Sequence, residues 1–417
     1  MMDSSARSVY LITDAYPYGP GEKTFVEPEI EYLASRHELT VVSMARADEV
    51  ADVANLSRLP DGVRLLHYEP SGQLRRLASS LSHLHSTLWR DEVCAIRAER
   101  GPHVKWETDS LKYYGNALDI HAWLASQGVF DGSLDTLVYC YWMRPASLAV
   151  LVERALGSSV RVICRVHGFD LYAERYRNDR QPFHRSTFSA FDKVVFACEA
   201  ARRYAVETYG IADDPRRYPV CRLGTEAGRA QTLEDGHVFT VVSCAHAIAL
   251  KRIDLTIRSL ALLRGRFPLR WVHFGGGVEL EPLRQLAREL GVPADFRGQV
   301  PFPKIRAFYE QEYVDLFLTT SSSEGGCPVS IQEAMAYGIP IVGTDVGGVP
   351  EEIDGNGELL PKDPAPEQVA RVIERIHGLD PSRVDAMRAR SMELWGERFD
   401  RRKNLELVGD LVASAFD

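Results

Sequence analysis

An α/β fold with parallel sheets is predicted by the way in which apolar runs and helical patterns alternate along the chain. Short runs typical of buried strands, such as residues 9–13, 161–166 and 238–244, are each followed by a loop and then by a helical pattern. The 417 residues, of which 45% are apolar, are enough for two or three domains with cores of their own.

Charge and hydropathy argue against several classes of protein. The formal net charge is −9, and the chain has no block of Lys or Arg, so we expect no nucleic-acid partner. Near the N-terminus only residues 9–12 form an apolar run, and no later run approaches the ~18 residues of a membrane span. No basic-hydrophobic patch is evident either. We therefore predict a cytoplasmic protein without stable membrane insertion.

The 7 cysteines are scattered and include no C-x-x-C pair. Several of them lie inside apolar runs. This distribution is typical of reduced core cysteines and indicates neither a disulfide framework nor a zinc site.

The most informative stretch is residues 319–349, which follows the strand-like run 314–318. Pro328 can stand at the start of a helix because that position needs no N–H group. The helical pattern then continues over residues 329–337, and a second strand-like run covers residues 339–342. A strand, a loop, a helix and a further strand are therefore predicted in this order.

The loop of this unit contains Glu324, Gly325 and Gly326 and lies at the carboxyl end of a parallel sheet. Free N–H groups at a helix start favour an anion there, and the missing Cβ atoms let it approach the backbone. Glu333 lies inside the helix, where its carboxylate can accept two hydrogen bonds from a diol. A generic glycine-rich turn is the alternative for this stretch taken alone.

The first half of the chain opens with a strand, a loop over residues 14–22 and a helix over residues 25–35. Gly19 and Gly21 lie in the loop, but a G-x-G-x-x-G fingerprint is missing, so a dinucleotide site is weakly supported. A surface turn is the alternative. The alternation breaks over residues 71–127, where we predict a helical insertion.

A second candidate group follows the strand at residues 161–166, which ends in His167. An imidazole at the carboxyl end of a strand points into the crevice where open α/β sheets bind ligands, although a buried core histidine is the alternative. Asp170 is predicted to cap the next helix. After the strand at residues 238–244 come Lys251 and Arg252.

These features resemble the retaining glycosyltransferases of family 4, also called glycosyl transferases group 1. The family pattern is Ser-x-x-Glu-Gly-x-Pro, then four residues and Glu-Ala-Met/Leu. The resemblance covers residues 236–361 and, more loosely, 7–45 and 130–225. It implies the GT-B architecture, in which two Rossmann-like domains face each other across a cleft and the last helix crosses back to the first domain.

The domain boundaries expected from this resemblance are residues 1–230 for an acceptor-side domain and 236–398 for a nucleotide-sugar domain. Residues 399–417 would form the last helix.

The resemblance also implies roles for individual residues. Glu333 would hold the ribose diol, His167 and Glu324 the sugar, and Lys251 the diphosphate. The donor would be bound in addition by a set of loop residues, namely Gly19, Gly21, His246, Arg252, Gln299, Val300, Gly325, Gly326, Cys327, Pro328 and Val329. The chain has no Asp-x-Asp motif, so we expect no metal and no cofactor.

Two departures from the family pattern stand out. His246 occupies the position of a family arginine, and an imidazole cannot form a bidentate fork, so either His246 or Arg252 would have to replace it. Eight residues separate Glu324 from Glu333 where the family has seven. Either the loop absorbs one residue as a bulge and Glu324 reaches the sugar, or main-chain groups hold the sugar.

The sequence therefore predicts an enzyme that moves a sugar from a nucleotide diphospho-sugar, a UDP-sugar rather than a GDP-sugar, to a small-molecule or glycan acceptor with retention of configuration. A non-catalytic sugar-binding partner protein of the same fold is the first alternative. A nucleotide-sugar epimerase is the second. Nucleotide binding without turnover would indicate the first, and an epimer formed without acceptor would indicate the second.

Overall fold

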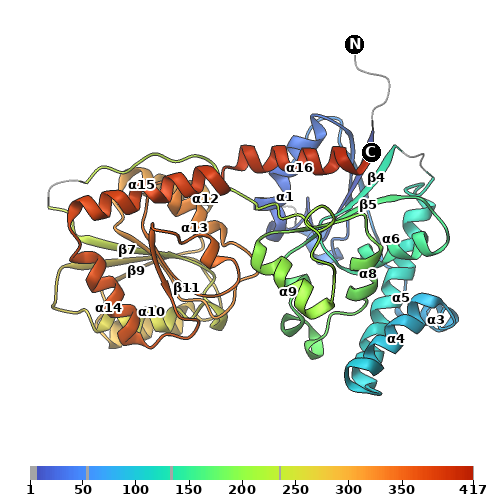
Figure 1. The fold of residues 1–417 in the computed structure, drawn as a ribbon, viewed down its shortest axis with the longest axis horizontal. Helices are drawn as coiled ribbons and strands as arrows, with labels where there is room; N and C mark the ends of the chain where they lie inside the picture. The colour runs from blue at the N-terminus through green and yellow to red at the C-terminus, as the bar shows by residue number, and fades with distance from the viewer. Residues whose placement is uncertain (1–6, 53–55, 132–134, 234–235, 417) are drawn as a thin grey trace, which may run out of the picture. The chain divides into compact units, whose positions relative to one another are not determined.

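The computed structural model describes residues 7–52, 56–131, 135–233 and 236–416. They divide into two compact units. Unit 1 comprises Met1–Cys221 and Leu405–Asp417, and unit 2 comprises Arg222–Asn404. The helices and strands of both units are labelled in Figure 1.

Unit 1 is built on a six-stranded parallel sheet in the order β3-β2-β1-β4-β5-β6. The strands are β1 Ser8–Thr13, β2 Glu38–Ser43, β3 Arg64–His67, β4 Thr136–Cys140, β5 Arg161–Val166 and β6 Lys193–Phe196. The helices are α1 Pro20–Ala34, α2 Ala47–Ala51, α3 Gln73–Ser82, α4 Thr87–Arg100, α5 Val104–Ser126, α6 Pro145–Ala155, α7 Gly168–Leu171, α8 His184–Ala190 and α9 Glu199–Tyr209. The strand order reverses between β1 and β4, so the loops after these strands open a crevice.

The core of unit 1 explains why the chain returns to it at its end. Helix α16, Arg401–Phe416, brings Val408, Val412 and Phe416 into the cluster formed by α1 and the sheet. Each of these three side chains is less than a tenth exposed. The apolar stripe of the last helix thus has its partner in unit 1.

Unit 2 is built on a second six-stranded parallel sheet in the order β12-β11-β10-β7-β8-β9. Its strands are β7 Phe239–Cys244, β8 Leu269–Phe274, β9 Ala294–Gly298, β10 Leu316–Thr319, β11 Ile341–Thr344 and β12 Gly357–Leu360. Its helices are α10 Ile253–Ala261, α11 Leu280–Glu289, α12 Phe302–Gln311, α13 Val329–Met335, α14 Pro366–His377 and α15 Pro381–Arg398. The order reverses between β7 and β10, where loops of both strands meet.

The parallel α/β fold predicted from the sequence is confirmed, but three details differ. Helix α1 begins at Pro20, so Gly21 lies within the helix and the loop before it ends at Gly19. Strand β12 was not predicted, because it is only four residues long and begins with a glycine and a glutamate. The predicted insertion forms three helices, α3 to α5.

Among the helices that the structure describes, none combines the length and the apolar composition needed to cross a membrane.

Candidate functional site

The carboxyl edge of the unit 2 sheet brings two predicted residues together at the point where the strand order reverses. Lys251, in the loop after β7, donates to Glu324, in the loop after β10, at 2.5 Å between Nζ and Oε1. The two side chains are 20% and 11% exposed. The loops are also joined by the N–H of Ser322, which donates to the carbonyl of Leu250 at 2.9 Å. A cation is thereby held at the ligand-binding edge of an open sheet.

Arg252, the neighbour of Lys251, has a different environment. Its Nε donates to the carbonyl of Thr320 at 2.7 Å, and its Nη2 donates to the carbonyls of Ser321 and Lys362. Its Nη1 pairs with Asp363 at 2.7 Å. These contacts join the loops after β7, β10 and β12. The Arg252 guanidinium therefore stabilises the backbone segment that carries Lys251.

The loop after β10 packs closely against the loop after β11. Gly347 has a φ of +54°, and a Cβ there would lie 2.3 Å from the carbonyl oxygen of Glu324. The N–H of Gly348 donates to the carbonyl of Gly326 at 3.0 Å. Within the described residues, the N–H groups of Gly325 and Gly326 make no hydrogen bond. Two adjacent donors are thus left for an anion beside Lys251.

Cys327, Pro328 and Val329 form the transition from this loop to α13. The Cys327 thiol is buried and lies 3.5 Å from the carbonyl of Gly348, to which it donates. The side-chain amide of Gln332 donates to the carbonyl of Cys327 at 3.1 Å. Pro328 precedes the first helical residue, Val329, as its missing N–H allows.

Glu333 lies one turn further along α13 and is only 8% exposed. Burial raises the pKa of its carboxyl to about 8, and Arg401 lowers that pKa by a smaller amount. Within the described residues no hydrogen bond is made to this carboxyl. A buried carboxyl without donors is costly, unless a ligand supplies them.

The remaining unit 2 candidates lie at the ends of β7 and β9. His246 is exposed. The neighbouring Ala247 donates its N–H to the carbonyl of Gly276 at 2.8 Å. The side chain of Gln299 approaches the same glycine, whose N–H lies 3.4 Å from Oε1. Val300 is half-buried beside it. Both loops therefore border the same sheet edge.

In unit 1 the loop after β1 is closed by the chain itself. The carboxylate of Glu22 accepts the N–H groups of Asp14, Ala15 and Tyr16 at 3.0, 2.6 and 2.8 Å. It also accepts the indole N–H of Trp142. Glu22 thus occupies three backbone donors of the loop that precedes Gly19 and Gly21.

His167 lies at the end of β5, as predicted, and is enclosed by aromatic rings. The ring centroid of Trp142 lies 4.4 Å away and that of Tyr141 lies 5.3 Å away. Burial, together with a smaller effect of nearby Arg165, lowers the pKa of the imidazole to about 3. Its Nε2 is buried and has no hydrogen-bond partner among the described residues. Asp170 accepts the N–H of His167 at 2.7 Å, which confirms its role as a helix cap.

Sequence reasoning missed Glu22 and Trp142. Glu22 was visible as an acid one residue after Gly21, but only the fold shows that it turns back onto its own loop. Trp142 follows β4, and the tryptophan offered no motif.

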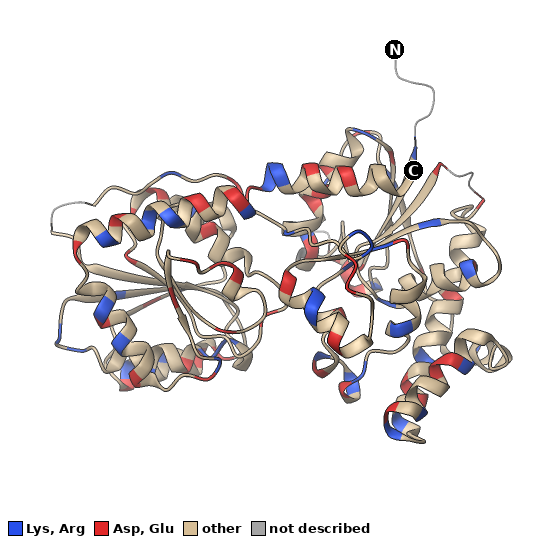
Figure 2. Ribbon diagram, in the orientation of Figure 1, with Lys and Arg blue, Asp and Glu red and all other residues tan. Residues whose placement is uncertain are grey.

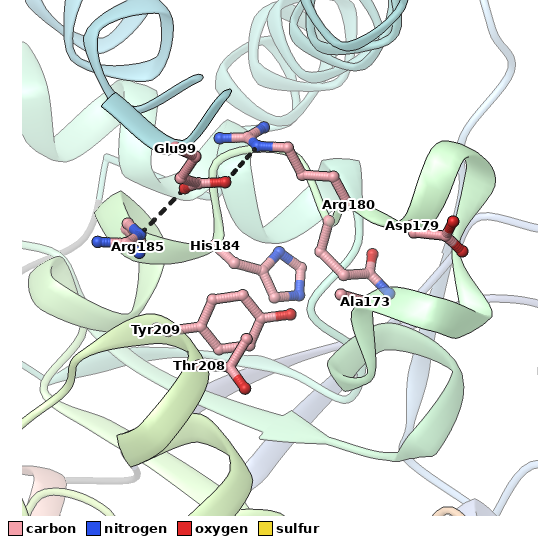
Figure 3. Close-up of a pocket in the computed structure, with 9 residues that line it drawn as sticks. Glu99, Ala173, Asp179, Arg180, His184, Arg185, Thr208 and Tyr209 are labelled. Atoms are coloured by element: carbon pink, nitrogen blue, oxygen red, sulfur yellow. Dashed lines mark hydrogen bonds and ion pairs between the residues drawn. The ribbon is translucent and has the colours of Figure 1, made fainter. Parts of the chain in front are cut away.

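Unit 1 also contains a polar cavity of about 230 Å³. Figure 3 shows the network along it, in which Glu99 pairs with both Arg180 and Arg185. His184 and Tyr209 form another part of the wall. His184 hydrogen-bonds to the carbonyl of Asp170, so the cavity adjoins the short helix that follows His167.

Comparison with known proteins agrees with this geometry. The model of the family Glycosyl transferases group 1 matches residues 225–390, which lie in unit 2. WcaL of Salmonella typhimurium, described as a colanic acid biosynthesis glycosyltransferase, is 22% identical over 91% of this chain and 93% of its own length. A GDP-mannose-dependent phosphatidylinositol monomannoside mannosyltransferase of Mycobacterium tuberculosis is 28% identical over 60% of this chain and 68% of its own.

Solved structures share the fold over nearly the whole chain. The sucrose-phosphate synthase of Thermosynechococcus elongatus has a TM-score of 0.71 at 15% identity and covers 98% of this chain and 99% of its own. Anabaena Alr3699/HepE, solved in complex with UDP, has a TM-score of 0.66 at 14% identity and covers 98% and 100%. The chain therefore has the GT-B fold of glycosyltransferases. The family match and the relatives support the group 1 glycosyltransferases as its class.

Proposed function

We propose that the protein transfers a glycosyl group from a nucleotide diphospho-sugar, with UDP rather than GDP as the carrier, to an acceptor hydroxyl. We further propose that the anomeric configuration is retained and that no metal takes part. The observation that carries this proposal is Lys251, held by Glu324 at the edge of unit 2 where the strand order reverses. UDP as the carrier is supported by the solved structure of Alr3699/HepE with that nucleotide.

The donor half of the proposal uses unit 2 alone. The ribose diol would donate two hydrogen bonds to Glu333, which meets no other donor in the described residues. The diphosphate would accept the N–H groups of Gly325 and Gly326 and lie beside Lys251. Because Arg252 is committed to backbone carbonyls, we propose the exposed His246 as the second side chain that contacts the diphosphate.

In the proposed reaction the acceptor hydroxyl approaches the face that the diphosphate leaves. A leaving-group oxygen takes the hydroxyl proton as the new glycosidic bond forms and the bond to the diphosphate breaks. Lys251 and the loop N–H groups stabilise the charge that develops on the leaving oxygen, which is where electrostatic stabilisation has its largest effect. Glu324, held by Lys251, would then meet sugar hydroxyls.

On unit 1 we assign His167 to the sugar and the polar cavity to the acceptor. The neutral imidazole has an unused Nε2 with which to accept or donate a hydrogen bond. The cavity offers guanidinium and carboxylate groups that suit sugar hydroxyls. Arg185→Ala is therefore expected to raise the KM for a glycan acceptor several-fold in initial-rate assays. An unchanged KM for the acceptor would remove the cavity from the site.

The experiment that tests this function follows nucleotide release and product together. The full chain is incubated with UDP-sugars and a panel of glycan acceptors, with and without EDTA. We expect UDP release that requires acceptor and survives EDTA, and an NMR coupling at the new bond that matches the donor anomer. UDP binding without turnover would indicate a non-catalytic protein, and an epimer formed without acceptor would indicate an epimerase.

A further inference from the structure

Phe169 is an exposed aromatic side chain at the carboxyl edge of the unit 1 sheet, where open α/β sheets bind ligands. It is 52% exposed, and of the Phe, Tyr and Trp side chains that the structure describes only this one is exposed. It follows His167 by two residues, in the short helix α7. Asp170 and Leu171 of the same helix are buried, so α7 presents a phenyl ring to solvent.

Arg144 holds this ring from one side. Its guanidinium carbon lies 5.2 Å from the centre of the Phe169 ring, within the range of a cation–π contact. Its Nε lies 3.5 Å from the carboxylate of Asp14, in the loop after β1. The carbonyl of Phe169 accepts a hydrogen bond from the side-chain amide of Gln181 at 3.0 Å. Both the ring and the backbone of this residue are therefore held in place.

Three loops of the sheet edge are joined beneath the ring. The N–H of Met143, after β4, donates to the carboxylate of Asp170 at 2.6 Å. Glu22 links the loop after β1 to the indole of Trp142, which lies against His167. The surface around the phenyl ring is thus formed before a ligand arrives, and this lowers the entropic cost of binding one.

The polar groups beside the ring suit a neutral ligand with many hydroxyls. The side chains of Arg144 and Asp14 are each 36% exposed and offer donors and an acceptor side by side. Among the described residues no hydrogen bond engages the terminal nitrogens of Arg144. A sugar hydroxyl both donates and accepts, whereas an anion would meet the charge of Asp14. The apolar C–H face of a pyranose can pack on the open side of the phenyl ring.

The polar cavity of about 230 Å³ adjoins this surface. Two of its lining residues hold α7, since Gln181 donates to the carbonyl of Phe169 and His184 hydrogen-bonds to that of Asp170. Figure 2 shows both signs of charge interspersed along α4 and α9, which flank the cavity, so a neutral ligand suits it too. Pockets for drug-sized ligands measure about 300–1,000 Å³, so this smaller cavity suits a single sugar ring.

We propose that the acceptor is an oligosaccharide of at least two sugar units. Its terminal sugar packs on Phe169 between Arg144 and Asp14, and its second sugar fills the polar cavity. This order brings a hydroxyl of the terminal sugar next to His167, which is proposed to hold the donor sugar. The inference rests on the glycosyl transfer proposed above and adds the class of acceptor.

The first test compares KM values for matched acceptors at saturating UDP-sugar. The pairs are methyl β-glucoside with methyl β-cellobioside, methyl β-galactoside with methyl β-lactoside, and methyl α-mannoside with methyl α-mannobioside. In the parent chain we expect the preferred disaccharide to have a KM at least about tenfold below that of its monosaccharide. Phe169→Ala should raise both KM values about tenfold, the scale of one stacking contact. Arg185→Ala, in the cavity, should raise only the KM of the disaccharide.

The second test needs no catalysis. Saturation-transfer NMR with the same glycosides, without any nucleotide, reports which sugar protons lie against aromatic rings of the protein. We expect transfer to the axial C–H protons of the terminal sugar in the parent chain, loss of it in Phe169→Ala, and recovery in Phe169→Trp, which keeps an aromatic ring.

The two tests separate this inference from the proposed function. Glycoside binding through Phe169 without any UDP release would remove the transferase activity and leave the sugar site in place. UDP release with equal KM values for monosaccharides and disaccharides would leave the activity in place and overturn the inference.

Two further results would overturn it. One is the failure of the parent chain to bind any of these glycosides. The other is a loss of UDP affinity in Phe169→Ala, which would assign the ring to the nucleotide base. Leu156→Ala, at the 72% exposed end of α6, is the control and should match the parent chain in every assay. Melting curves check that each variant folds.

Discussion

Two buried glutamates, one in each unit, occupy similar places and have opposite surroundings. Glu22, in the first turn of α1, accepts three backbone N–H groups and the indole N–H of Trp142. Glu333, in α13, accepts no hydrogen bond within the described residues, and burial raises its pKa to about 8. The two side chains are 4% and 8% exposed, so burial alone does not distinguish them.

We propose that the difference separates a structural carboxylate from one kept for a ligand. The donors around Glu22 offset the cost of its burial and hold the loop after β1 in one conformation. Around Glu333 that cost is not offset, and the two hydrogen bonds of a ribose diol would offset it. The glycine-bearing loop after β1 is therefore filled by a side chain of the protein itself, whereas we propose that the loop after β10 is kept for a ligand.

The proposed donor site of unit 2 is tested most strongly by removing its cation, Lys251. We expect Lys251→Ala to lower the rate of sugar transfer at least about 100-fold, the scale of losing one strong electrostatic group at a developing charge. Initial rates with saturating donor measure the effect. Lys304→Ala, which removes an exposed lysine of the same unit, is the control. Near-parental turnover of the Lys251 variant would contradict its assignment.

Glu333→Gln is expected to stabilise the fold while it weakens nucleotide binding. Between an unfolded-state pKa near 4.5 and a native pKa of about 8, the native state holds the proton that the unfolded state has lost. Native stability therefore falls as pH rises through this window, and glutamine escapes the loss. We expect the variant's Tm to exceed that of the parent, with a gap that widens from pH 5 to pH 8 and corresponds to a few kcal/mol. A difference in Tm between variant and parent that is the same at pH 5 and pH 8 would refute this prediction.

Glu22→Ala should have the opposite effect on stability. It leaves the N–H groups of Asp14, Ala15 and Tyr16 without their acceptor, and we expect a loss of about 2 kcal/mol. Urea denaturation measures it, with Glu31→Ala on an exposed part of α1 as the control. If Glu22→Ala instead leaves stability unchanged and weakens UDP binding, the loop after β1 is part of the donor site after all.

The smallest expected effect is that of Glu324→Gln, which keeps the shape and removes the charge that faces Lys251. We expect about a tenfold loss in kcat/KM for the donor, the scale of one charge-assisted hydrogen bond. Initial rates over a range of donor concentrations provide the value. Unchanged kinetics would mean that main-chain groups hold the sugar, as the longer spacing between Glu324 and Glu333 also allows.

Much of the fold could be predicted because the signals are local. The strand at residues 161–166 was placed with its observed bounds and those at residues 9–13 and 238–244 within one residue of them, since their apolar signals lie in one short segment. The early start of α1 was missed because two glycines and a proline suggested a loop.

The site was predictable where residue type and spacing carry the chemistry. The sequence placed Glu324 in a loop at the sheet edge, the family resemblance placed Lys251 at the diphosphate, and the structure joins these two side chains. It could not show that Arg252 is used on three backbone carbonyls, because such contacts depend on loops far apart in the chain. For the same reason, the sequence could not show that Glu22 binds the backbone of the loop after β1.

The most direct test of the central claim is calorimetric titration of the parent chain and Glu333→Gln with UDP. If the diol binds the carboxylate, binding favours the charged form of Glu333, so the parent chain must release protons that the variant does not. In the parent chain we expect UDP binding that strengthens from pH 6 to pH 8.5, with a binding heat that depends on the buffer. In the variant we expect weaker binding whose affinity does not change with pH and whose heat does not depend on the buffer. Equal affinity and equal proton release in both proteins would contradict the claim that Glu333 is kept for the donor.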